Sequence, residues 1–274
     1  MQPTRTQTEK RWLLWPPLAF FAIALGIPMA MLLVQSFDRG GGAFVEMFTM
    51  SSFTAALLRT LVMAAVVTVL TTLIGAVYGL AIWAAPRWFS GILLAWLMLS
   101  LWTSIVVRTV GWMLLEIPRG AIYWLLSSLG LVEEPIELYQ TALAMYPAMV
   151  AVMLPFVVLP AMTAMSSIDR EQLNAAVIFG AGPTLVLRSV ILPALMPALI
   201  SGGVLVFVMS LGFYVTPLLL GGPANLTVSG LINLQVNTLN RPDLGASMSL
   251  LLVAATVVIY LIADRLFKVS EKWG

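Results

Sequence analysis

The feature that most constrains this chain is a series of long apolar runs without a charged side chain. Leu61–Ala84 is 24 residues long and holds no Asp, Glu, Lys or Arg, and the stretch from Ser189 to Asn240 is uncharged for 52 residues. A helix needs about 20 predominantly apolar residues to cross the hydrocarbon core of a bilayer. Charged residues make up only 9% of the chain, whereas a soluble domain carries about 25%. The chain therefore predicts an all-α, polytopic membrane helical bundle.

Six transmembrane helices account for these runs. The longest run is broken by turn-forming residues at Tyr214–Pro217 and Gly221–Pro223, so only its first part predicts a span. The first run is 22 residues long, longer than the roughly 7–15 apolar residues of a signal peptide, and we expect it to be a retained span. The predicted spans are Leu13–Val34, Leu61–Ala84, Trp88–Val107, Thr141–Met162, Leu195–Leu211 and Leu244–Ala263.

Lysine and arginine predict the orientation of the bundle, because they are enriched on the cytoplasmic side of a membrane. With a cytoplasmic N-terminus, nine of the 14 Lys and Arg residues fall in inner segments and five in outer segments. This bias predicts that both termini are cytoplasmic. The outer loop Glu116–Glu137 has an apolar middle, Ala121–Leu131, which predicts a short interfacial helix, with a plain solvated loop as the alternative.

The composition also excludes several kinds of site. The chain has no Cys and no His, which removes disulfides, thiolate metal sites and the commonest general base. A formal net charge of +2 gives no reason to expect nucleic-acid binding. The chain also has no glycine-rich phosphate loop of the P-loop type, so we do not expect it to bind ATP. We therefore expect no catalytic residue, no metal and no cofactor of its own.

One polar segment lies between the fourth and fifth predicted spans. Asp169 is a candidate helix cap, with Gln172 completing a capping box, and Ser167 is a competing cap. Gly180 ends the predicted helix, because glycine tolerates the left-handed conformation found just past a helix end. The apolar face of this short helix, formed by Leu173, Ala176 and Val177, needs a cover. That cover is either the membrane or the protein's own inner face, or a groove on a cytoplasmic subunit, and the residues alone leave both open.

The same segment resembles the EAA loop of binding-protein-dependent ABC importer permeases. That pattern is Glu-Ala-Ala, three residues, Gly, nine residues, Ile, one residue and Leu-Pro. The spacing matches throughout, with asparagine in place of the glutamate and valine in place of the isoleucine. The matching residues are Asn174, Ala175, Ala176, Gly180, Val190, Leu192 and Pro193.

Four further stretches resemble the spermidine/putrescine-type subfamily of these permeases, over a match from about Leu57 to the C-terminus. They are Arg108–Trp112, Leu154–Pro160, Gly212–Pro217 and Leu219–Pro223. The resemblance implies the ABC type I importer transmembrane fold. Residues 1–56 would hold an N-terminal tail, the first span and an outer loop. Residues 57–274 would form the transmembrane domain, with the cytoplasmic EAA coupling loop at 166–193.

The resemblance also implies partners and a solute. The partners are a cytoplasmic dimer of ABC ATPases that binds the ATP, a second permease subunit that is usually a paralogue, and a periplasmic binding protein, in the bacterial inner membrane. The solute is a polyamine such as spermidine or putrescine, with amino-acid derivatives, phosphonates, opine-like solutes, and iron or thiamine compounds as alternatives. The residues that it assigns to ATPase coupling are Asp169, Glu171, Asn174, Ala175, Ala176, Gly180, Leu192 and Pro193.

Polar and aromatic side chains in the spans are candidates for a substrate pathway. Arg108 is a charge at the end of a predicted span, where the alternative to function is a side chain that reaches the outer lipid headgroups. A polyamine requires carboxylates, carbonyls or aromatic faces, and Glu116 is among the groups available. The pathway candidates are Trp102, Arg108, Trp112, Tyr214 and Tyr78.

Two other classes of membrane protein are less favoured by the residues. An ion-coupled secondary transporter usually needs an acid near mid-membrane, whereas Asp264 lies at the cytoplasmic end of the last predicted span. A membrane enzyme needs a convergent cluster of catalytic groups, which this sequence does not offer. The G-x-x-x-G spacing of Gly75 and Gly79, and the pair Gly202 and Gly203, predict close contacts between helices.

Overall fold

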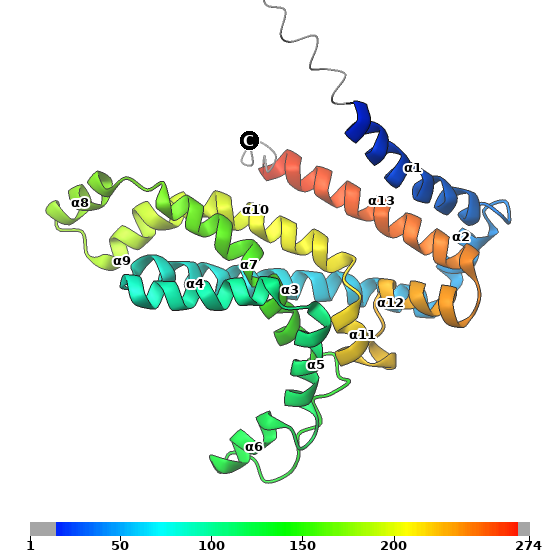
Figure 1. The fold of residues 1–274 in the computed structure, drawn as a ribbon, viewed down its shortest axis with the longest axis horizontal. Coiled ribbons are helices and arrows are strands. Elements are labelled where there is room, and N and C mark those ends of the chain that lie inside the picture. The colour runs from blue at the N-terminus through cyan, green and yellow to red at the C-terminus, as the bar shows by residue number, and fades with distance from the viewer. Residues whose placement is uncertain (1–14, 268–274) are drawn as a thin grey trace, which may run out of the picture.

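The computed structural model describes residues 15–267, without the side chains of Arg170, Asn174 and Val177. Helices are the only regular elements in this part of the chain (Figure 1). The predicted N-terminal tail, Lys268 and Lys272 lie outside the described residues. The elements are α1 (Trp15–Ser36), α2 (Gly42–Thr49), α3 (Ser51–Ala84), α4 (Arg87–Trp102), α5 (Ile105–Glu116), α6 (Ala121–Ser128), α7 (Met145–Ser166), α8 (Arg170–Ile178), α9 (Pro183–Val186), α10 (Leu192–Leu211), α11 (Val215–Gly221), α12 (Val228–Asn233) and α13 (Pro242–Phe267), with π-helical turns at Leu187–Ile191 and Leu234–Thr238 and a 3-10 turn at Pro223–Asn225.

Five helices are long and apolar enough to cross a membrane. They are α1, α3, α7, the continuous helix Pro183–Leu211 and α13, each at least 22 residues long. A bent pair, Arg87–Trp102 with Ile105–Ser128, gives a sixth crossing when it is counted as one span. The prediction of a helical membrane bundle is therefore confirmed, and α1 and α13 lie close to their predicted bounds, whereas α7 begins four residues later than predicted.

The third predicted span, Trp88–Val107, is wrong as a straight helix. α4 ends at Trp102, and the chain continues at an angle of 107° to it. Thr103 and Ser104 have extended ψ angles of 135° and 136°, and the Thr103 hydroxyl donates to the carbonyl oxygen of Leu99 over 2.6 Å. Hydroxyl groups that bond to nearby backbone compete with the helical pattern and bend helices. These two residues end the helix, although no proline or glycine marks the break in the sequence.

Two other spans begin before the uncharged runs that predict them. α3 begins at Ser51, so that Arg59 lies within the helix on an exposed side. The fifth span is predicted from Leu195, but its helix runs without interruption from Pro183 to Leu211. The π-helical turn Leu187–Ile191 lies directly before Pro193, and the Leu192 N–H bonds to the carbonyl oxygen of Leu187, five residues back. This turn adapts the helix to Pro193, a residue without an N–H.

The centre of the bundle is formed by α3, α7 and α10, which pack against one another. Glycines permit the close approach, because a Cβ atom at Gly75 would lie 2.8 Å from Cγ1 of Val157 and one at Gly202 would lie 3.0 Å from the carbonyl oxygen of Phe156. The second glycine of each predicted pair also faces a neighbouring helix, at Met165 and Thr72. The predicted close helix contacts are therefore confirmed.

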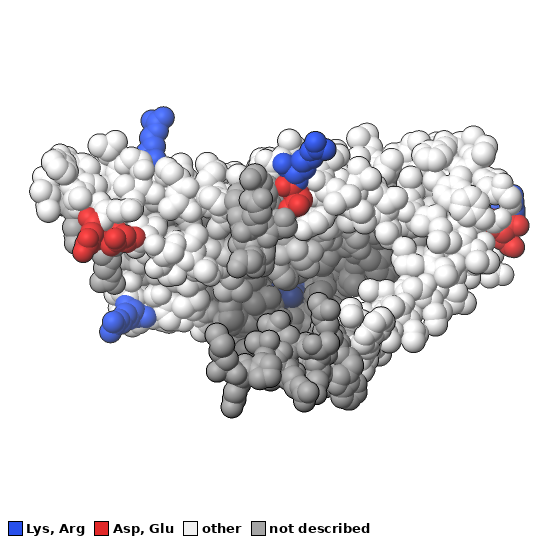
Figure 2. Space-filling model, turned by 90° about the horizontal axis from the view of Figure 1, so that it is seen from above, with Lys and Arg blue, Asp and Glu red and all other residues white. Residues whose placement is uncertain are grey.

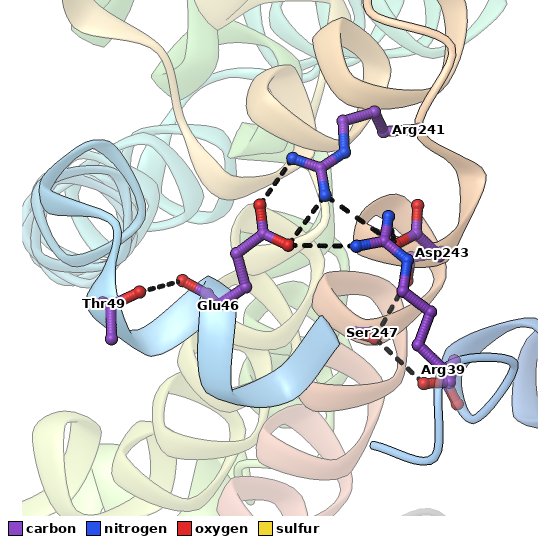
Figure 3. A network of polar contacts seen from close by, with 7 residues as sticks. Arg39, Glu46, Thr49, Arg241, Asp243 and Ser247 are labelled. Atoms are coloured by element: carbon purple, nitrogen blue, oxygen red, sulfur yellow. Dashed lines mark hydrogen bonds and ion pairs between the residues drawn. The ribbon is translucent and has the colours of Figure 1, made fainter. Parts of the chain in front are cut away.

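A cluster of ion pairs lies where α1 leads into α2 and where α13 begins (Figure 3). Glu46 of α2 accepts hydrogen bonds from both terminal nitrogens of Arg241, over 2.5 and 2.7 Å. Arg39 approaches Glu46 at 3.3 Å and the Asp243 carboxylate at 2.5 Å. Asp243 is buried in the first turn of α13, where a negative charge interacts favourably with the helix dipole. These four side chains join the α1–α2 connection to the start of α13.

The charged side chains are distributed unevenly over the surface. Figure 2 shows charged side chains at the two ends of the elongated molecule and a further group of basic and acidic side chains near the middle of its upper edge, with uncharged surface between these groups. Most side chains of α1 and many of α4 and α13 are exposed and apolar. An exposed surface of this kind is suited to lipid or to another membrane subunit rather than to water.

Candidate functional site

The predicted coupling helix is α8, which lies at the end of the bundle opposite α2 and α12 (Figure 1). The Asp169 carboxylate accepts a hydrogen bond over 2.8 Å from the backbone N–H of Glu171 and so caps the helix. Ser167, the competing cap, instead donates its hydroxyl to the carbonyl oxygen of Ala164. Glu171 is exposed in the first turn, where its charge is favourable.

The end of α8 is fixed by hydrogen bonds as the sequence predicts. Gly180 has a left-handed φ of 77°, and the Ala181 N–H reaches back to the carbonyl oxygen of Ala176 over 2.9 Å. α9 then begins at Pro183 and continues through the π-helical turn into α10. Leu192 and Pro193 are the first two residues of α10, and both are exposed. The coupling loop is thus a chain of short helices that leads directly into a long membrane helix.

One side of α8 is apolar and exposed. Ala175, Ile178 and Phe179 follow i, i+3, i+4 spacing, and Ile178 and Phe179 are 81% and 90% exposed. We call these three residues the apolar tip. Leu173 is half-buried and packs against the core of the bundle instead. The protein's own inner face therefore covers Leu173, while no described residue covers the tip.

The apolar face that the sequence predicts for α8 differs from the apolar face that the structure exposes. Ala176 is half-buried, and the side chains of Asn174 and Val177 lie outside the described residues. The sequence analysis assigns the apolar face to Leu173, Ala176 and Val177, and it does not predict that Ile178 and Phe179 are exposed. The sequence feature that could have predicted this surface is the apolar pair Ile178 and Phe179 directly before Gly180, which ends the helix.

A cavity of about 770 Å³ lies between α7 and α10. It begins beside α8, where Ser167 forms part of its wall, and its remaining polar side chains are Thr163 and Ser201. No charged residue is among the described residues that line it, and Pro155, Pro160 and Pro197 all contribute to its walls. The hydroxyl groups of Thr163, Ser167 and Ser201 all donate to nearby backbone carbonyl oxygens, so the described walls offer few free hydrogen-bond donors to a ligand.

The five predicted pathway residues are spread over several elements, with Arg108 and Trp112 both on α5, and none of them lines this cavity. The Tyr78 hydroxyl donates to the carbonyl oxygen of Leu93 over 2.7 Å and joins α3 to α4. Arg108 donates over 2.8 Å to the hydroxyl of Ser100, which bonds in turn to the α7 backbone at Ala151. Trp102 is 86% exposed at the end of α4, whereas Trp112 packs against the core and Tyr214 is half-buried before α11.

α5 buries polar residues and exposes apolar ones. Its two fully buried residues are Thr109 and Glu116, and the Thr109 hydroxyl lies 2.9 Å from that of Thr216 in α11. The sequence placed Glu116 in an outer loop, but it is the last residue of α5 and is 3% exposed. One oxygen of its carboxyl group, Oε2, is buried without a hydrogen-bond partner. The helix that follows, α6, has no buried residue and agrees with the prediction of a short helix in this loop.

The sequence matches a known protein family over nearly its whole length. The model of the family described as "Binding-protein-dependent transport system inner membrane component" matches residues 13–273. The chain is also similar to the spermidine/putrescine transport system permease protein PotB of Escherichia coli strain K12. The two are 28% identical over 256 residues, which cover 90% of this chain and 93% of PotB.

Two solved structures have the same fold. A bacterial ABC transporter involved in the import of the acidic polysaccharide alginate matches with a TM-score of 0.83 and 20% identity, covering 95% of this chain and 96% of that one. A bacterial alginate ABC transporter in complex with an alginate pentasaccharide-bound periplasmic protein matches with a TM-score of 0.78 and 20% identity, covering 96% of both chains. The expected ABC importer permease fold is confirmed. The chain belongs to the family of binding-protein-dependent transport system inner membrane components.

Proposed function

We propose that this chain is a permease subunit of an ATP-driven ABC importer for a polyamine such as spermidine or putrescine. In this proposal α8 lies in the cytoplasm, together with both termini, and binds a subunit of an ATPase dimer. The observation that carries the proposal is the exposed apolar tip, held on a capped helix at one end of the bundle. The fold and the family support the same assignment.

The apolar tip has the properties of a binding surface. Burial of a side chain such as Ile or Phe contributes about 1.5–3 kcal/mol relative to leaving it in water. Ile178 and Phe179 together would therefore offer roughly 3–6 kcal/mol to a partner groove, before the costs of association are subtracted. Ala175 adds little volume, so a partner can approach the helix backbone closely. Asn174 carries no charge, so its contribution would be a hydrogen bond rather than an ion pair.

The loop connects this surface to the membrane helices on both sides. α7 ends four residues before α8 begins, and α9 leads through the π-helical turn into α10. A displacement of α8 would therefore change the separation of α7 and α10, which form the walls of the cavity. Closure of an ATPase dimer would move α8 and shift the access of the pathway between the two sides of the membrane.

The pathway would be completed by a second permease, which we expect to be a paralogue. The mainly apolar cavity between α7 and α10 is our candidate for this chain's share of it. A periplasmic binding protein would deliver the solute at the end that carries α2 and α12. One of the matching structures contains such a periplasmic protein. The described walls of the cavity carry no charged side chain, which agrees with selectivity that depends mainly on the binding protein.

The test is uptake into vesicles that contain the complete transporter. We expect this chain, the second permease, the ATPase and the binding protein to import radiolabelled putrescine only when ATP is supplied inside and the liganded binding protein outside. Uptake that persists without the ATPase would show an ion-coupled transporter instead. ATP-dependent uptake of a phosphonate or an amino-acid derivative, without uptake of putrescine or spermidine, would refute the choice of solute but not the mechanism.

A further inference from the structure

We propose that Glu116 binds an ammonium group of the transported solute, at a site between α5 and α11. The proposal rests on the proposed function, because it assigns a place in this chain to a cationic solute. α5 and α11 lie away from α8 (Figure 1), so the site would meet the solute before it reaches the α7–α10 cavity.

The first observation is a buried acid without a partner. Glu116 is 3% exposed, and its Oε2 atom makes no hydrogen bond. The ion pairs of Arg39 and Arg241 all belong to the α1–α2–α13 cluster, and none of them involves Glu116. A buried carboxyl group that lacks a partner is unfavourable unless some other state of the protein supplies one. The described residues do not supply it, so we look for the partner among molecules that bind to the permease.

The second observation is the surface that surrounds the acid. Thr109, Trp112 and Glu116 follow i, i+3, i+7 spacing and therefore share one face of α5. Thr109 packs on α11, where its hydroxyl group meets that of Thr216 at 2.9 Å, and Trp112 packs against the core of the bundle. Along about two turns of α5, this face therefore presents hydroxyl oxygens, an indole ring and a carboxyl group, which are groups that recognise an alkylammonium ion. An anionic solute would be repelled by the same set.

Arg108, the nearest basic residue along α5, does not pair with Glu116. Arg108 donates to the hydroxyl of Ser100, which links α5 to α4 and not to α11. The helix exposes Val106, Val107 and Leu114 while it buries Thr109 and Glu116. Such an arrangement directs polar groups toward the protein and apolar groups toward lipid, as expected beside a solute pathway. An alternative partner for Glu116 is a basic side chain of the second permease, and the experiment below distinguishes the two.

The test compares three variants in vesicles that contain the complete transporter. Glu116→Gln removes the charge and keeps the shape, Glu116→Asp keeps the charge, and Glu134→Gln removes an exposed acid from the same outer region. We expect Glu116→Gln to raise the KM for putrescine about tenfold or more, Glu116→Asp to have a smaller effect, and Glu134→Gln to match the wild type. The ATPase rate stimulated by the liganded binding protein should change less than twofold in all three.

The outcomes separate the two proposals. Wild-type vesicles that do not import putrescine would refute the proposed solute. Normal putrescine uptake by both the wild type and Glu116→Gln would overturn the site while leaving the proposed function intact. Loss of the second permease when Glu116→Gln is purified, with no such loss for Glu134→Gln, would show that Glu116 binds that subunit instead and would overturn the site.

A labelling experiment covers the case in which Glu116→Gln does not assemble. Dicyclohexylcarbodiimide modifies carboxyl groups in apolar surroundings, and mass spectrometry locates the adduct in the wild-type transporter. Protection of Glu116 by putrescine, but not by an equal concentration of sodium ion, would support the site. Equal labelling with and without putrescine would overturn it.

Discussion

The guanidinium group of Arg241 holds the carboxylate of Glu46 through two hydrogen bonds, although the residues lie 195 positions apart in the chain. The bonded Arg241, with a further contribution from Arg39, holds the pKa of Glu46 below its ordinary range. α1 buries only Ser36 among its own residues, so contacts at this end of the helix are important for its position against α13. The pair therefore predicts a pH-dependent contribution to stability.

Glu46→Gln should lower the melting temperature of the protein in lipid nanodiscs at pH 7. A carboxylate whose pKa is depressed by folding stabilises the fold above its unfolded pKa, near 4.3, and loses this contribution as the pH falls through the lower folded value. The difference between Glu46→Gln and the wild type should therefore shrink below about pH 4. Tryptophan fluorescence during heating measures the melting temperature at each pH, with Glu134→Gln as the control. An equal difference at pH 7 and at low pH would contradict this account of the pair.

Thr60→Val should destabilise the contact between α3 and α12. The Thr60 hydroxyl accepts a hydrogen bond from the backbone N–H of Val228 over 2.9 Å, and both residues are buried. Valine has the same shape but leaves this N–H unpaired, which costs about 1–3 kcal/mol. Thr60→Ser retains the hydroxyl and should recover most of the loss. Hydrogen exchange at the Val228 amide should be faster in Thr60→Val than in the wild type or in Thr60→Ser. Equal exchange rates in all three proteins would show that the bond contributes nothing.

Gly202→Val should weaken the packing of α10 on α7. A Cβ atom at this position already meets the Phe156 carbonyl oxygen at 3.0 Å, and backbone cannot move away as a side chain can. Overpacking of this kind costs about 1–3 kcal/mol. Gly26→Val is the matched control, because a Cβ atom at Gly26 meets nothing within 4 Å. Equal unfolding midpoints for the two variants in a denaturant titration would contradict the close contact.

Much of this fold could be predicted from the sequence, because length and apolarity determine whether a helix can cross a bilayer. The short helix α8 could be located as well, since Asp169 and Gly180 act through local backbone geometry. The break between α4 and α5 could not, because Thr103 and Ser104 are tolerated inside helices and end this one only in its tertiary setting. The burial of Glu116 could not be predicted either, because the sequence shows only an acid beside a loop and does not show which helix covers it.

Asp169→Ala should weaken coupling by loosening the start of α8. Loss of a cap costs a helix about 0.5–2 kcal/mol. Asp169→Asn keeps a capping oxygen and removes the charge, so it should restore most of the ATPase stimulation by the liganded binding protein. An asparagine variant as impaired as the alanine variant would show that the charge of Asp169, rather than the cap, is required.

We expect the apolar tip to lie in the cytoplasm and to bind the ATPase. The chain contains no cysteine, so a single cysteine at Phe179 can be labelled without background. In oriented membrane vesicles, a membrane-impermeant maleimide should label Phe179→Cys only from the cytoplasmic side, and bound ATPase should block the labelling. Labelling from the outer side, or equal labelling with and without the ATPase, would contradict the account.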